Sequence, residues 1–261
     1  MFDYHLHTSV SYDANSTAAE MIEAARRAGL KDICFTDHMD YAHGTPHDQI
    51  SYRVEDYNRA YDGLSDPEIA IHFGVEMGLT PWNQAEIAAD LKARHYDFVI
   101  GSVHFVDDYD IYLAPWWEGR TAFDAERTYF QEMLECVKTH DDFDVLGHLT
   151  YVAKPPVSPL SRIIPLADHQ EIIDEILKVL VSKGKGMEVN TSGIDRFGDF
   201  LPGAEYLRRF KELGGEIVTV GSDAHNPERV GQYADRACAM LKEIFGYACT
   251  FADRKPVFHK L

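Results

Sequence analysis

Histidines and carboxylates recur in short motifs along this sequence, and their spacing indicates a metal site. The first motif is His5-Leu6-His7, whose two imidazoles stand two residues apart. On a β-strand, that spacing turns both side chains to the same face. The other candidate ligands share this chemistry, and they are Asp37, His38, Glu76, His104, His148, Glu188, Asn190, Asp223 and His225.

Nitrogen and oxygen ligands of this kind, with no thiolate among them, suit Zn, Mn or Fe. The set is too large for one ion, and at roughly four to six donors per ion it could hold two or three. A carboxylate that bridged two ions would hold them about 3.5–4 Å apart, the separation used in two-metal phosphoryl chemistry. Bound ions also neutralise phosphate oxygens and activate water. The motifs therefore predict a metal-dependent phosphoesterase with two to three divalent ions.

The elements that must position these residues are short apolar runs alternating with helical patterns. Seven runs are typical of buried parallel strands, namely Phe2–Leu6, Asp32–Thr36, Ile69–Val75, Asp97–Gly101, Phe143–Leu146, Met187–Val189 and Glu216–Val220. Apolar residues at three- and four-residue spacing predict the helices, namely Thr17–Ala28, Gln84–Arg94, Ala122–Thr139, Asp168–Lys183, Gly203–Leu213 and Arg229–Phe245. Seven repeated strand–helix units predict an α/β fold with a closed or nearly closed barrel. The alternative is an open doubly wound sheet, although no GxGxxG or GxxxxGK[ST] motif supports a common nucleotide fold.

Every predicted strand has a ligand-type residue at or near its C-terminal end. In parallel α/β barrels, those ends converge on one face, where active sites are built. A single histidine there is more often a core or surface residue, and a single aspartate more often caps a helix. The coincidence at seven strand ends is what favours a site. We expect ordinary structural roles for the remaining histidines, which are His43, His47, His72, His95, His140, His169 and His259.

Composition limits the partners. The chain has 261 residues and a formal net charge of −18, which argues against nucleic acid or an anionic membrane, because both attract Lys/Arg patches. A phosphate substrate would therefore need local positive charge from ions or arginines. The four cysteines form no CxxC pair and are expected to be reduced thiols. No apolar run reaches the ~18 residues of a membrane span and no signal peptide precedes the first strand, so we expect a cytoplasmic protein.

Two irregular regions are predicted at Asp40–Asp66 and at the proline-rich segment Pro155–Pro165, which we expect to form an extended lid or wall. Two arginines lie on loops of the predicted active face, Arg162 inside the second region and Arg196 after the sixth strand. A guanidinium fork there could clamp phosphate oxygens. The alternative for both arginines is a surface salt bridge.

The loop after the fourth strand contains Trp116-Trp117-Glu118. Aromatic rings beside a carboxylate could cradle a cationic imidazole or amine. They could equally form a packed lid, and the sequence leaves both interpretations open.

The ordered motifs resemble the PHP (polymerase and histidinol phosphatase) family. They are His5-Leu-His7-Thr, Phe35-Thr-Asp-His38, Val75-Glu76, Ser102-Val-His104, Gly147-His148 and Gly221-Ser-Asp-Ala-His225. The resemblance runs from residue 3 to about residue 231. The Ser102-Val-His-Phe105 and Gly147-His-Leu149 forms look most like the histidinol-phosphate phosphatase branch. The resemblance implies a distorted (β/α)7 barrel with parallel strands, in which residues 1–261 form a single domain.

The resemblance also implies three metal positions. By motif, the first ion would be held by His5, His7, Glu76 and Asp223, the second by Glu76, His104 and His148, and the third by Asp13, His38 and His225. Glu76 would bridge the first two ions, and a hydroxide between them would attack phosphorus. Asp13 and His225 would manage the proton of the leaving alkoxide. Asp37 would orient a ligand rather than bind an ion.

The function implied by the resemblance is hydrolysis of L-histidinol phosphate to L-histidinol and phosphate, a step of histidine biosynthesis. Arg162, Arg196 and Glu118 are the expected substrate contacts. One alternative is a PHP phosphoesterase acting on nucleotides, cyclic phosphodiesters or other small phosphate esters. Another is a metal-binding module without catalysis, against which the apparently complete ligand set argues. The partner is expected to be a small phosphorylated molecule, not nucleic acid or membrane. Substrate, metal identity and oligomeric state are left open by the sequence.

Overall fold

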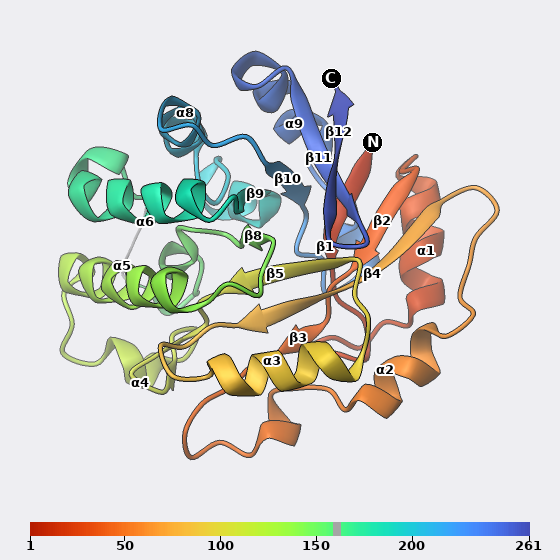
Figure 1. Cartoon of the computed structure of the whole chain (residues 1–261), viewed down its shortest axis with the longest axis horizontal. Helices are drawn as coiled ribbons and strands as arrows, with labels where there is room; N and C mark the ends of the chain where they lie inside the picture. Colours follow the sequence, from red (N-terminus) through yellow and green to blue (C-terminus); the bar gives the residue numbers. More distant parts are fainter. Residues whose placement is uncertain (159–162) are drawn as a thin grey trace.

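Parallel strands curve into a nearly closed barrel in the computed structural model, which describes residues 1–158 and 163–261 (Figure 1). In spatial order the seven barrel strands are β1 (Phe2–Leu6), β2 (Asp32–Phe35), β4 (Ala70–Gly78), β5 (Phe98–Ser102), β8 (Val145–Leu146), β9 (Gly186–Asn190) and β10 (Val218–Gly221). A two-residue strand, β3 (His38–Met39), pairs in parallel with the C-terminal half of β4. The spatial order follows the chain order, as expected for repeated strand–helix units. The predicted (β/α)7 barrel is confirmed.

The first and last strands meet through main-chain hydrogen bonds at their C-terminal ends. The Asp223 N–H donates to His5 O at 2.9 Å, and the His7 N–H donates to Ala224 O at 3.0 Å. Leu6 and Ala224 form a parallel bridge at the same level. These bonds bring two motifs from distant parts of the sequence side by side on one face of the barrel.

Helices cover the outside of the barrel (Figure 1). They are α1 (Ala18–Arg27), α2 (Val54–Tyr61), α3 (Gln84–Ala93), α4 (Ala114–Trp117), α5 (Ala122–Thr139), α6 (Gln170–Ser182), α7 (Ile194–Phe197), α8 (Ala204–Glu212) and α9 (Ala234–Ile244). Short 3-10 turns lie between them at η1 (His47–Gln49), η2 (Tyr151–Ala153), η3 (Leu166–Asp168), η4 (Thr191–Gly193) and η5 (Pro227–Arg229). Within the described ranges, no helix is long and apolar enough to cross a membrane.

Local capping explains where the helices begin. The Glu20 carboxylate accepts from the Thr17 N–H at 2.8 Å, while the Thr17 hydroxyl accepts from the Glu20 N–H, which completes a capping box at α1. The Thr121 hydroxyl accepts from the Asp124 N–H at the start of α5, and this helix has the predicted bounds.

The strands are buried because helices cover one face and the barrel interior the other. Every residue of β1, β5 and β9 is buried, which explains their nearly continuous apolar runs. Their polar exceptions are therefore conspicuous, since a buried charge needs a partner or an ion. The four cysteines are unpaired, as expected.

Some local elements differ from the sequence prediction. The region Asp40–Asp66, predicted to be irregular, contains η1 and the helix α2. That prediction was wrong because α2 is only 8 residues long and its two buried residues, Tyr57 and Tyr61, stand within a long polar stretch. Two hairpins were missed. These are β6 (Phe105–Val106) with β7 (Tyr109–Asp110), and β11 (Tyr247–Ala252) with β12 (Lys255–Lys260). Both turn through pairs with positive φ, Asp107-Asp108 and Asp253-Arg254, where the usual glycine signal is absent.

Candidate metal centre

The side chains at the C-terminal strand ends converge on one cavity of about 630 Å³. The described residues that line it are Tyr12, Asp13, His38, Glu76, His104, Asp110, Tyr112, Leu113, His148, Tyr151, Lys154, Ser192, Asp223, His225 and Arg229. His5 and His7 are fully buried and contact the carboxylates of Glu76 and Asp223 at the cavity. The structure thus brings together all nine residues predicted as metal ligands.

Glu76, on β4, turns one carboxylate oxygen toward the histidines of β1. Its Oε2 lies 3.2 Å from His5 Nε2 and 3.5 Å from His7 Nε2. Asp223 approaches the same pair, with Oδ1 3.8 Å from His5 Nε2 and 3.5 Å from His7 Nε2. These four side chains form the first group of donors, which is the set expected for the first ion.

The second oxygen of Glu76 faces a different pair of histidines. Its Oε1 lies 2.9 Å from His148 Nε2 and 3.3 Å from His104 Nε2, and the two Nε2 atoms are 3.4 Å apart. The Ser102 hydroxyl donates to the same oxygen at 2.6 Å, which fixes the carboxylate in place. Glu76 therefore stands between two donor groups with one oxygen in each, which is the arrangement that bridging requires.

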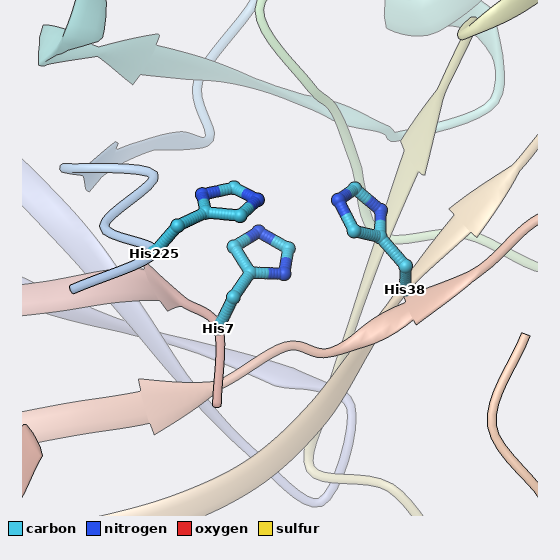
Figure 2. A group of neighbouring side chains, drawn as sticks. All are labelled: His7, His38 and His225. Atoms are coloured by element: carbon cyan, nitrogen blue, oxygen red, sulfur yellow. The ribbon is translucent and has the colours of Figure 1, made fainter. Parts of the chain in front are cut away.

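The third group lies toward the cavity mouth. Asp13 Oδ2 lies 3.1 Å from His225 Nε2 and 3.6 Å from His38 Nε2. Figure 2 shows the rings of His7, His38 and His225 grouped close together. The His7 ring centroid is 4.3 Å from that of His38 and 4.1 Å from that of His225. The first and third groups are therefore contiguous.

Buried carboxylates orient two of the imidazoles. Glu188 Oε1 lies 2.5 Å from His5 Nδ1, and Asp40 Oδ1 lies 2.9 Å from His104 Nδ1. A carboxylate accepts, so each Nδ1 donates its hydrogen, and each Nε2 faces Glu76, where it could offer a lone pair to a bound cation. Asp40 was not predicted, although it stands two residues after His38, the same spacing as in the first motif.

Asp37 acts on His7 through an intermediate hydroxyl. The Ser11 hydroxyl donates to Asp37 Oδ1 at 2.8 Å and lies 3.1 Å from His7 Nδ1. The Thr8 N–H and the Tyr61 hydroxyl also donate to Asp37. The Asp37 carboxylate is therefore held in place by several hydrogen bonds beside the donor groups.

Buried atoms without partners indicate that the centre is built for cations. Within residues 1–158 and 163–261, His5 Nε2, His7 Nε2 and Glu76 Oε2 are buried and have no hydrogen-bond partner. Unsatisfied buried polar atoms are costly and rare in native proteins. Nitrogen and oxygen donors that converge in this way suit Zn, Mn or Fe, so the residues fit the predicted ions.

The pKa values of His5 and Glu76 also indicate that the carboxylates of the centre favour positive charge nearby. Burial lowers the pKa of His5, but the carboxylates of Glu188 and Glu76 outweigh burial and raise that pKa well above its usual value. Burial raises the pKa of Glu76, but His5 and His104 outweigh it and bring that pKa well below its usual range. A proton on His5 thus balances the carboxylates around it, and a cation that binds there would replace that proton.

Two of the predicted substrate contacts, Arg196 and Glu118, are not among the described residues that line the cavity. The Arg196 guanidinium donates to the main-chain carbonyls of Lys154 at 2.8 Å and Ser158 at 3.1 Å, and also to that of Pro155. Arg196 therefore binds the backbone of the loop after His148, and it is not among the described side chains on the cavity wall. Its prediction as a phosphate clamp missed these carbonyls because the loop's path is not encoded locally. Arg162 lies outside the described residues.

The Trp-Trp-Glu motif is divided between core and surface. Trp116 and Trp117 are buried, and the Trp117 ring N–H donates to Ile111 O at 2.8 Å, which favours the packed lid. Glu118 is exposed at the end of α4 and is not among the described wall residues. The structure thus does not bring Glu118 to the candidate centre, and its substrate contact stays a prediction.

The remaining histidines have local partners. Their contacts are His43 with Asp108, His47 with Tyr41, His72 with Asp97, His95 with Asp253, His140 with Thr80, His169 with Glu126 and His259 with Thr250. None of them is among the described residues that line the cavity. The expectation of ordinary structural roles agrees with these contacts.

Comparison with known proteins identifies the family of this chain. The PHP domain family model matches residues 3–192. A histidinol-phosphatase of Lactococcus lactis subsp. lactis is 32% identical over 260 residues, which cover 97% of this chain and 95% of that protein. A probable histidinol-phosphatase of Thermotoga maritima is 29% identical and covers 94% of this chain and 92% of its own length.

Solved structures agree with the sequence relatives. The crystal structure of histidinol phosphate phosphatase from Lactococcus lactis, complexed with Zn, L-histidinol and phosphate, has a TM-score of 0.87 to this chain at 31% identity. The match covers 98% of each chain. The family model covers most of the sequence, and the relatives align from end to end, so this chain is a member of the PHP domain family.

Proposed function

We infer that this protein is a metal-dependent phosphomonoesterase that hydrolyses L-histidinol phosphate to L-histidinol and phosphate. The observation that carries the proposal is the position of Glu76, whose two oxygens face two separate groups of histidines. The similarity to the Lactococcus lactis histidinol-phosphatase, at 32% identity over nearly the whole chain, supports the choice of substrate. A reaction of this type would belong to histidine biosynthesis.

The three donor groups support an assignment of ligands to the ions. The sets are His5, His7, Glu76 and Asp223 for the first, Glu76, His104 and His148 for the second, and Asp13, His38 and His225 for the third. Bound ions would lower the pKa of a water and neutralise the phosphate oxygens. Zinc is supported by the Lactococcus lactis complex, and Mn or Fe would suit the same donors.

The mouth of the centre offers a route for the proton that the leaving alkoxide needs. Asp13 Oδ2 and His225 Nε2 lie 3.1 Å apart and both line the cavity. When no ion occupies the third group, this pair can share a proton and pass it to the leaving oxygen, the role expected of a general acid. Glu76 acts as the fixed carboxylate between the other two groups.

Other residues that line the cavity suit a small organic molecule. They combine the aromatic rings of Tyr12 and Tyr112 with Leu113 and the carboxylate of Asp110. Apolar contacts with a few polar groups are typical of small-ligand sites, and Asp110 could accept from a substrate amine. Contacts from Arg162, Arg196 and Glu118 remain predictions that the same assays can test.

The deciding experiment is phosphate release from a panel of esters by the metal-loaded protein. We expect histidinol phosphate to give the highest kcat/KM, above nucleoside monophosphates, sugar phosphates and a cyclic phosphodiester. If the protein prefers a nucleotide or a diester, the assignment of histidinol phosphate as substrate is wrong, while the proposed phosphoesterase activity stands. If the metal-loaded protein releases phosphate from none of the esters, the alternative of a metal-binding module without catalysis is favoured.

A further inference from the structure

Lys154 places a positive charge beside the candidate metal centre. Among the described residues that line the cavity, Lys154 and Arg229 are the ones with an ammonium or guanidinium group. Arg229 pairs with Asp195. The Lys154 ammonium instead pairs with Asp223, one of the candidate ligands. The Lys154 side chain is 22% exposed and that of Asp223 only 3%, so the ammonium borders open space while its partner does not.

The two oxygens of Asp223 have different neighbours. Oδ1 faces the donor group, 3.5 Å from His7 Nε2. Oδ2 accepts from Lys154 and lies 3.3 Å from Asn190 Nδ2. The ammonium therefore pairs with the Asp223 oxygen that does not face His7, and it lines the same cavity as the donor groups. A phosphate group whose oxygens reached the ions would bring another oxygen within reach of Lys154.

The backbone of Lys154 is fixed by its neighbours. Arg196 donates to Lys154 O at 2.8 Å, and the Lys154 N–H donates to Tyr151 O at 2.7 Å. The ammonium also lies 5.6 Å from the centroid of the Tyr151 ring, within the range of a cation–π contact. A long lysine side chain held at its base and along its length loses less conformational freedom when it binds an anion.

The ammonium has donors to spare. It carries three N–H bonds, and among the described contacts the hydrogen bond to Asp223 uses one. A carboxylate that also binds a cation has less charge to offer its lysine partner. The terminal oxygens of a phosphate monoester share a charge of about −1.5 to −2, and they are acceptors that a lysine in this position would favour.

We propose that Lys154 is a phosphate-binding residue, whose ammonium donates to an oxygen of the phosphate group beside Asp223, and that Arg196 positions it through the backbone. This rests on the proposed function, in which a phosphate monoester binds at this centre. It also gives Arg196 a role in phosphate binding without direct contact.

The test compares Lys154→Met, Lys154→Arg and wild type, each loaded with Zn. The control is Lys92→Met, which removes an exposed lysine of α3 away from the cavity wall. Three quantities are measured: the inhibition constant of inorganic phosphate, KM and kcat for p-nitrophenyl phosphate, and zinc content by mass spectrometry. Lys154→Met should raise the inhibition constant and KM roughly 10- to 100-fold, as expected when a hydrogen bond to a charged group is lost. Lys154→Arg should recover part of this loss, and Lys92→Met should match wild type.

A purely structural role for Lys154 predicts a different pattern. If Lys154→Met lost zinc while the zinc-loaded fraction kept the wild-type inhibition constant, phosphate binding by Lys154 would be overturned. Arg196→Gln should raise the same constant by a smaller factor, and an unchanged value would overturn the positioning role. If wild type cleaves p-nitrophenyl phosphate but not histidinol phosphate, only the substrate assignment fails. If wild type cleaves no ester, calorimetric titration of inorganic phosphate into zinc-loaded wild type and Lys154→Met still decides the role of Lys154.

Discussion

Glu188 contacts residues of two donor groups at once, with Oε1 2.5 Å from His5 Nδ1 and Oε2 2.8 Å from the main-chain N of His148. The carboxylate sits on β9, in the interior of the barrel, and is buried. It therefore fixes the ring of His5 and the backbone that carries His148. Residues that orient metal ligands in this way commonly contribute to affinity almost as strongly as the ligands do.

Glu188→Gln should weaken metal binding about 10- to 100-fold, because the amide holds the His5 ring less strongly than a carboxylate does. Competition with a fluorescent zinc chelator measures the affinity. Glu126→Gln is a matched control, since Glu126 is a buried carboxylate 2.6 Å from His169 Nε2, away from the centre. Equal zinc affinity in Glu188→Gln and Glu126→Gln would contradict the orienting role.

Glu76→Ala should abolish turnover and remove two ions, because both groups lose the carboxylate that they share. Zinc per chain by mass spectrometry and phosphate release give the two readouts, and circular dichroism checks the fold. Ser102→Ala removes only the hydrogen bond to Glu76 Oε1 and should keep the ions with a smaller loss of rate. Near-wild-type turnover in Glu76→Ala would refute the bridging role.

Removal of the ions should destabilise the protein, because a ligand that binds only the folded state stabilises it. The gain is about 2.7 kcal/mol for one site at a ligand concentration 100 times its Kd. We expect a chelator to lower the Tm of the wild type by several degrees. The Glu76→Ala variant should respond much less, and a wild-type Tm that is the same with and without chelator would argue against bound ions.

Glu132 should make stability fall as the pH rises through neutrality. Burial, together with the charges of Asp107 and Asp108, raises the pKa of Glu132 from 4.5 to about 7. The folded state therefore holds this proton between pH 4.5 and about 7 while the unfolded state releases it, so stability decreases with pH across that window. The full cost is present above pH 7.

Glu132→Gln should accordingly be more stable than wild type at pH 8 by about 1–2 kcal/mol, a value reduced for the partial exposure of the side chain. At pH 4.5 the two should be nearly equal. Urea unfolding at both pH values measures this, with Glu175→Gln, an exposed change on α6, as the control. A difference that does not depend on pH would show that ionisation of Glu132 is not its cause.

The sequence was sufficient for the barrel and for the convergence of the ligands, because both follow from local patterns. An apolar run that ends in a histidine, as in His5-Leu6-His7, identifies a strand and its functional end together. The spacing of Asp40 from His38 could have identified the partner of His104 by the same argument. What local patterns could not show is which oxygen of Glu76 faces which histidine.

The substrate contacts were harder to predict because they depend on loops. Arg196 and Glu118 follow strands or helices at plausible positions, but their side chains depend on the paths of residues far away in sequence. Lys154 had no motif of its own, and only the folded loop brings it to Asp223. The β6–β7 hairpin, which carries Asp110, turns through Asp107 and Asp108 with positive φ. Aspartate can adopt this conformation, but its presence does not predict it.

The main-chain hydrogen bond between Asp223 and His5 joins residues that the ribosome makes at very different times. A ribosome adds about 5–20 residues per second, so roughly ten to forty seconds separate the two residues as they are made. During that interval, the donor atoms of β1 lack the strand that completes their group. The first donor group can therefore gain its Asp223 ligand only late in translation or after it.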